Sequence, residues 1–80
     1  MTREISIDRL SCRAREYFGG DVQGFWIERE PGRGATFYSV VQRPHWGGGR
    51  REAARVCALS ARDAAKQFNR MARGASRSHS

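Results

Sequence analysis

The segment from Ser60 to Gly74 restricts the fold of this 80-residue chain more than any other. Ser60 is a typical helix N-cap, and Asp63, three residues later, suits the positive end of the helix dipole. Gly74 stands where a left-handed C-terminal cap is expected. Between these ends, apolar residues recur at helical spacing and predict one buried stripe: Ala61, Ala64, Ala65, Phe68, Met71 and Ala72. The segment therefore predicts a helix that packs one face into the core.

The other face of this predicted helix is basic, with four cations at helical spacing: Arg62, Lys66, Arg70 and Arg73. Binding to phosphates requires several cations on one rigid surface, which a helix provides. A solvated helix face, with its last arginines at the negative end of the dipole, is the alternative interpretation. We expect this face to bind an anionic partner, either nucleic acid or an acidic protein surface.

The net charge of +7 is concentrated in the second half of the chain. Residues 1–18 carry four arginines against three carboxylates, and residues 19–42 carry two arginines against three carboxylates. Residues 43–80 carry eight arginines and Lys66 against two carboxylates, a balance of +7. Codon bias explains why arginine is preferred to lysine, but it does not explain this placement. The asymmetry supports an anionic partner.

Length and composition predict a single α+β domain over residues 1–74, followed by a disordered polar tail over residues 75–80. No apolar run is long enough to span a membrane, and the polar N-terminus lacks the apolar stretch of a signal peptide. We therefore expect a cytoplasmic protein.

Cys12 and Cys57 follow no metal-ligand spacing. Two reduced, partly buried thiols are expected, and a single disulfide is the alternative.

A first helix is predicted over residues 5–18, with apolar positions on one side and Gly19-Gly20 at its end. Ser6 is its expected N-cap. The competing interpretation is a short strand over residues 5–7, with the helix starting at Asp8.

Residues 24–43 predict a β-hairpin, because two runs rich in aromatic and β-branched residues flank the turn sequence Pro31-Gly32-Arg33-Gly34. If Glu30 pairs with Ala35, one face of the hairpin is apolar and should face the core. That face comprises Phe25, Ile27, Tyr38 and Val40. A longer loop would change the register and move the residues of one strand to the other face. The opposite face would carry Trp26, Glu28, Glu30, Phe37, Ser39 and Val41.

Residues 44–51 contain three consecutive glycines and predict a mobile loop that presents Trp46, Arg50 and Arg51. Residues 53–59 are expected to form a third strand, although an early start of the last helix is the alternative. The order is then α-β-β-β-α. This order predicts a small α+β fold, in which two helices pack on one face of a three-stranded antiparallel sheet.

Three aromatic residues are candidates for stacking on a base or for anchoring a protein interface: Trp46, Trp26 and Phe37. For Trp46, the alternative is a lid folded back on the core. For Trp26 and Phe37, structural packing is favoured over an exposed patch. Arg50 and Arg51 are expected to add mobile contacts to the partner of the basic helix.

The sequence offers little for catalysis. The two histidines fall in a loop and in the tail, the carboxylates are scattered, and no glycine-rich phosphate-binding motif is present. The spacing of cysteine and histidine fits no metal site. We therefore expect a non-enzymatic binding module, without catalytic residues, metal or cofactor.

The predicted order over residues 5–73, with its basic second helix, resembles the double-stranded-RNA-binding domain. That family opens its second helix with a Ser-Lys-Lys-x-Ala-Lys run that grips phosphates across the major groove. Here the run reads Ser60-Ala61-Arg62-Asp63-Ala64-Ala65, in which alanines replace two of the lysines. The resemblance implies phosphate contacts by Arg62, with Lys66 one position later than in the family.

Small size, an Arg/Ala-rich composition and absent catalytic motifs are also typical of proteins encoded by phages and mobile elements, among them anti-CRISPR inhibitors. The alternative function is therefore an inhibitor that binds and blocks a host protein complex, for example a nucleoprotein complex, through the hairpin face and the aromatic loop. A homodimer formed through the open sheet edge or the aromatic face is a third hypothesis.

Overall fold

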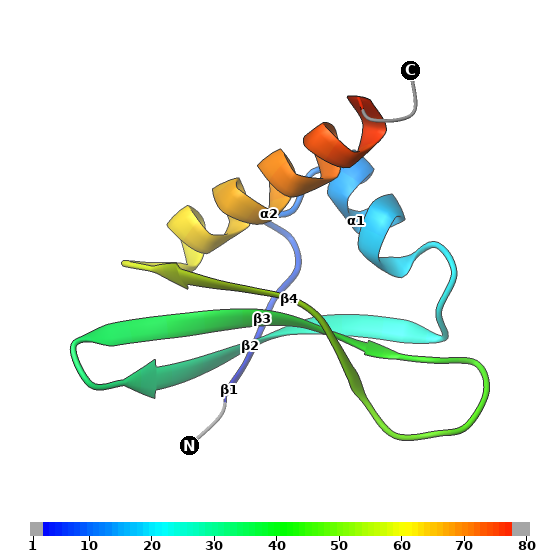
Figure 1. The fold of residues 1–80 in the computed structure, drawn as a ribbon, viewed down its shortest axis with the longest axis horizontal. Coiled ribbons are helices and arrows are strands. Elements are labelled where there is room, and N and C mark those ends of the chain that lie inside the picture. Colours follow the sequence, from blue (N-terminus) through cyan, green and yellow to red (C-terminus); the bar gives the residue numbers. More distant parts are fainter. Residues whose placement is uncertain (1–2, 78–80) are drawn as a thin grey trace.

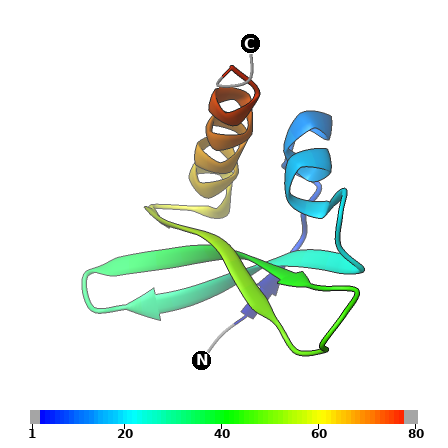
Figure 2. The same ribbon diagram turned by 45° about the vertical axis from the view of Figure 1, so that its right-hand side comes forward.

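The computed structural model describes residues 3–77 as two layers, a four-stranded antiparallel sheet and two helices on one of its faces (Figure 1). The four strands lie in the sheet in the same order as along the chain. The two helices lie side by side over the sheet (Figure 2). The elements are β1 (Arg3–Ile5), α1 (Cys12–Gly19), β2 (Gly24–Gly32), β3 (Ala35–Arg43), β4 (Arg51–Ala58) and α2 (Ala61–Arg77). The α+β class is as predicted, but the sheet has four strands where three were expected.

The N-terminal segment differs from the prediction because it starts with a strand. β1 pairs antiparallel with β2, and Ile5 packs against the core from this strand. α1 begins only at Cys12, and its N-cap is Ser11, not Ser6. Ser11 Oγ accepts a hydrogen bond from the backbone N–H of Ala14 at 3.1 Å. A strand forms here because it supplies hydrogen-bond partners to the backbone of β2 while its isoleucine still reaches the core.

The β2–β3 hairpin has a tighter turn than predicted. Gly32 pairs with Ala35, which leaves residues 33–34 in the turn, and Gly34 adopts a positive φ of 69°. Two-residue loops are the commonest hairpin connections, and the positive φ falls on a glycine, which adopts it without steric cost. The predicted pairing of Glu30 with Ala35 is therefore wrong by two residues. A shift of two leaves the side-chain faces unchanged. The predicted core face is retained: Phe25, Ile27, Tyr38 and Val40.

One hydrophobic core fills the space between the sheet and the helices. Phe68 of α2 is its largest fully buried side chain, and its ring meets that of Phe18 edge-to-face at a centroid distance of 5.9 Å. The predicted stripe of α2 is largely buried, except that Met71 is 40% exposed. The buried cluster consists of Leu10, Ala14, Phe18, Ile27, Tyr38, Val40, Val56, Ala64, Ala65, Phe68 and Ala72. Because its other buried residues are alanines, α2 depends on Phe68 for most of its apolar contact.

α2 begins as predicted but ends later. Ser60 Oγ accepts a hydrogen bond from the Asp63 N–H at 3.2 Å, which is the expected N-cap contact. Gly74 is not a C-cap, because the helix continues through it to Arg77 and its φ is not positive. A glycine costs a helix only about 1 kcal/mol, which good helix formers on either side offset. The predicted tail is therefore helical over residues 75–77, and its last three residues lie outside the described part of the chain.

Neither cysteine reaches the core. Cys12 and Cys57 are free thiols and both are exposed, whereas partial burial was predicted. Cys57 lies opposite Phe37 on the sheet face that the helices do not cover, called here the helix-free face. None of the helices within residues 3–77 is long and apolar enough to cross a membrane.

A β-bulge in β4 decides which of its side chains face the helices. The consecutive residues Val40-Val41 pair with Ala54 and Glu52, so Ala53 is an extra residue. The bulge reverses the alternation of side chains along the strand. As a result, Arg51 lies on the helix side of the sheet and Glu52 on the helix-free face. The predicted third strand of the chain is confirmed as β4, the fourth strand of the sheet.

Candidate functional site

The basic face of α2 is exposed. Its four cations are Arg62, Lys66, Arg70 and Arg73. None of the four forms an ion pair or a hydrogen bond with another residue in the described part of the chain. From the first to the last, the row is roughly 16 Å long, at about 1.5 Å of helix rise per residue. These side chains are therefore available to an external anion.

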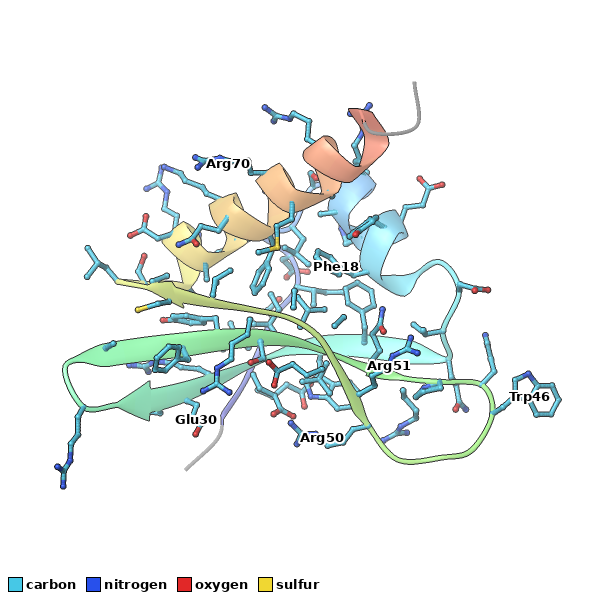
Figure 3. All side chains as sticks on the ribbon, in the orientation of Figure 1. Phe18, Glu30, Trp46, Arg50, Arg51 and Arg70 are labelled. Atoms are coloured by element: carbon cyan, nitrogen blue, oxygen red, sulfur yellow. The ribbon has the colours of Figure 1, made fainter. Side chains whose placement is uncertain are left out.

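The arginines at the start of β4 have partners inside the protein. Arg50 forms an ion pair with Glu28. Arg51 donates two hydrogen bonds to Gln42 Oε1, from Nε at 3.1 Å and from Nη2 at 2.8 Å. Both were predicted to act together with the basic helix. The structure does not bring them there. Arg50 lies on the other side of the sheet from Arg70 (Figure 3), and Arg51, although on the helix side, is bound to Gln42.

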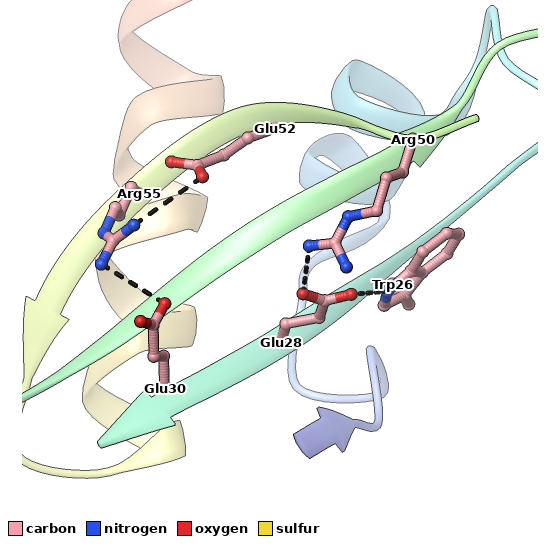
Figure 4. A network of polar contacts seen from close by, with 6 residues as sticks. All are labelled: Trp26, Glu28, Glu30, Arg50, Glu52 and Arg55. Carbon is pink, nitrogen blue, oxygen red and sulfur yellow. Dashed lines mark hydrogen bonds and ion pairs between the residues drawn. The ribbon is translucent and has the colours of Figure 1, made fainter. Parts of the chain in front are cut away.

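Glu28 is the centre of a polar network on the helix-free face (Figure 4). Its Oε2 accepts a hydrogen bond from the indole N–H of Trp26 at 2.7 Å, and its Oε1 pairs with the Arg50 guanidinium. The Glu28 side chain is only 11% exposed. A carboxylate that has lost most of its water needs such partners, because a buried charge without them is costly. The network therefore fixes the orientation of both the indole ring and the guanidinium.

Arginines cover the two aromatic residues of the helix-free face. The Arg43 guanidinium carbon lies 5.7 Å from the centroid of the Trp26 ring, and that of Arg55 lies 4.7 Å from the Phe37 centroid. Arg55 also pairs with Glu30 at 3.5 Å. Both rings are only partly exposed. Trp26 and Phe37 therefore form no open apolar patch, and packing under cationic side chains describes them better.

Replacing Glu28 by glutamine should lower the melting temperature by roughly 5–10 °C, because loss of a charge-assisted bond costs about 1–2 kcal/mol in a domain of this size. The indole N–H keeps an acceptor, whereas Arg50 loses its counter-charge. Glu30→Gln is the matched control, on the same strand and face, but with a side chain that is 55% exposed. It should shift the transition by less than about 3 °C, since surface ion pairs contribute little. Equal shifts of the melting temperature in the two variants, measured by thermal denaturation, would show that the Glu28 network adds nothing to the stability.

Trp46 lies in the loop over residues 44–50 and is 89% exposed, so it is not a lid on the core (Figure 3). The three glycines that follow, Gly47, Gly48 and Gly49, have φ values of 89°, 64° and 77°. Side chains rarely tolerate this region of backbone conformation. A Cβ at any of the three would meet nothing within 4 Å. The loop therefore needs glycine for its backbone path, and not to make room for a neighbour.

Sequence reasoning missed the role of Glu28 and its link to Arg50. Alternation along β2 already placed Trp26 and Glu28 on one face, and this signal could have suggested their contact. The arginine partner had no comparable signal, because the path of the glycine loop decides where it lies.

Among the residues that the structure describes, no group of three or more His, Cys, Asp and Glu side chains could hold a metal ion.

Comparison with known proteins adds no family to this geometry. No protein-family model, curated protein or solved structure matches the chain. Two surfaces are candidates for binding a partner, the exposed basic face of α2 and the loop end of the helix-free face around Trp26.

Proposed function

We propose that this protein is a non-enzymatic module that binds the phosphate backbone of nucleic acid through the exposed face of α2. The observation that supports this most directly is the contrast between two sets of cations. The four cations of α2 have no partner in the described chain, whereas Arg50 just before β4, and Arg51 and Arg55 within it, are all engaged. Exposed arginines elsewhere in the described chain, such as Arg13 and Arg33, are also unpaired, but α2 places four such cations along one face.

The geometry of the row suits a phosphate backbone. Successive cations at four-residue spacing are separated by about 6 Å along the helix axis, so each can meet a different phosphate. Long flexible side chains on a rigid helix allow such contacts without a fixed sequence of bases. This role fits a cytoplasmic protein and predicts affinity for nucleic acid with little sequence preference.

The opposite side of the molecule has no comparable excess of positive charge. The helix-free face holds four carboxylates and three guanidinium groups: Glu4, Glu28, Glu30, Glu52, Arg43, Arg50 and Arg55. A polyanion should therefore approach from the helix side, because charge complementarity orients the encounter.

An inhibitor of a host protein complex is the second candidate function, and one observation favours it. Trp46 is 89% exposed, and tryptophans are enriched among the residues that anchor protein interfaces. Leu59, 96% exposed, is a second apolar side chain open to a partner. Self-association through the edge of β4 is less favoured. That edge carries the bulge and charged side chains, and Gln67 Nε2 donates to the Cys57 carbonyl at 3.1 Å, all of which hinder strand pairing.

A salt titration tests the nucleic-acid proposal. If four phosphates are contacted, log K for a short duplex should fall against log salt with a slope of about −3 to −4. The measurement is fluorescence anisotropy of a labelled duplex at several salt concentrations, with unrelated sequences compared in parallel. An affinity that does not change with salt would rule out backbone binding and favour the protein-interface alternative.

A further inference from the structure

A hollow of about 450 Å³ lies between the glycine loop and the Trp26 side chain. Arg50, one of its lining residues, lies on the other side of the sheet from Arg70 of α2 (Figure 3). A second hollow of about 470 Å³ shares Trp26 and Arg43 with it. Both volumes fall within the roughly 300–1,000 Å³ typical of small-molecule sites. The residues of the first hollow that matter here are Trp26, Arg43, His45, Gly48, Gly49 and Arg50.

Two side chains of this hollow, Trp26 and Arg50, are held in place by Glu28. The Trp26 ring is oriented by its N–H bond to Glu28, and Arg50 is held by the same carboxylate. Arg43 lies over the ring at 5.7 Å, near the outer limit of about 6 Å for a cation–π contact, so it can move to a ligand at little cost. Glu28 balances the charge of Arg50, and Glu4 lines the adjoining hollow, so Arg43 is the guanidinium of this site without an ion-pair partner in the described chain.

Gly48 and Gly49 of the glycine loop line the same hollow. The backbone N–H groups of Gly48 and Gly49 donate to no acceptor within the described residues. Neither residue has a side chain, and the space around each is open. Backbone N–H groups that a ligand can approach closely are a recurring means of binding phosphate.

We propose that the hollow binds one nucleotide unit, with its base stacked on Trp26 and its phosphate held by Arg43, Arg50 and the Gly48 and Gly49 amides. A planar ring beside guanidinium groups and free amides matches a ligand that joins a flat base to an anion. The ligand is either a free mononucleotide or the unpaired end of a strand. The site lies apart from the α2 row, so it extends the proposed function and does not depend on it.

The chain has two tryptophans, which makes a direct test possible. In Trp46→Phe, the remaining fluorescence comes from Trp26 alone. We expect adenosine monophosphate to quench it saturably, with a Kd between about 10 µM and 1 mM. Ribose 5-phosphate, which has no base to stack, should quench much less. A five-nucleotide single strand that binds at least about tenfold more tightly than the mononucleotide indicates a strand end, and equal affinity indicates a free nucleotide.

Arg43→Gln in the Trp46→Phe background should weaken nucleotide binding about tenfold, because it removes one charge-assisted phosphate contact. Arg43 is exposed, so this variant is expected to fold, and Arg33→Gln at the hairpin turn is the matched control. Absence of saturable quenching of Trp26, or an equal effect of the two substitutions, would overturn the proposal. Neutralising the α2 cations should leave mononucleotide binding unchanged. Loss of duplex binding alone therefore reports on the α2 surface, and loss of mononucleotide binding alone reports on this hollow.

Discussion

Replacing Arg62 and Arg70 by glutamine together is expected to weaken duplex binding about 50-fold at about 0.1 M salt. At this salt concentration, each phosphate contact contributes close to tenfold through counterion release, and the double variant removes two of four contacts. The slope of log K against log salt should fall by about half, from roughly −3.6 to roughly −1.8. Glutamine is nearly as good a helix former as arginine, so α2 should keep its structure. Fluorescence anisotropy with a labelled duplex measures both quantities.

Arg33→Glu is the control for total charge. The double glutamine variant and this single reversal both lower the net charge of +7 by two, to +5. Arg33 is exposed in the β2–β3 turn, away from α2. If α2 is the binding surface, the control should lose only a few-fold in affinity through the long-range field. Equal weakening of the two variants would mean that net charge, and not the α2 row, governs binding.

Replacing Phe68 by alanine should remove a large part of the free energy of unfolding of the domain. A buried phenylalanine replaced by alanine costs about 3–5 kcal/mol, because apolar contact is lost and a cavity remains. A domain of 80 residues has a total of only about 4–12 kcal/mol. The side chain is fully buried and contacts Phe18, and the neighbouring buried residues on α2 are alanines that cannot fill the space. The melting temperature measured by circular dichroism should fall by about 15–30 °C.

Met71→Ala on the same helix is the matched control. Its side chain is 40% exposed, so it should cost about 1 kcal/mol at most. A Phe68→Ala protein that melts within a few degrees of the parent would contradict the packing of α2 described above. It would also remove the basis for treating the α2 cations as a rigid row.

Local patterns along the chain were enough to predict α2 and the hairpin. The N-cap at Ser60 and the buried stripe through Phe68 follow from a period of 3.6, and both are confirmed. The core face of the hairpin follows from a period of two, which survives even though the predicted register was wrong by two residues. The exposed position of the four α2 cations follows from the same helical period.

Contacts between distant segments could not be predicted in this way. β1 forms because β2 offers hydrogen-bond partners some 24 residues later in the chain. Arg50 meets Glu28 only because the glycine loop returns the chain to the helix-free face. Arg51 meets Gln42 only because the bulge at Ala53 reverses the alternation of side chains along β4. Arginines that look alike in the sequence thus differ in the structure, because Arg50 and Arg51 have partners and those of the α2 row have none within the described residues. The sequence by itself determined which face of each of these elements is apolar and can be buried, and which face carries the charges. The tertiary structure decided which charges found partners, because pairing depends on strand register and loop path, which no local period encodes.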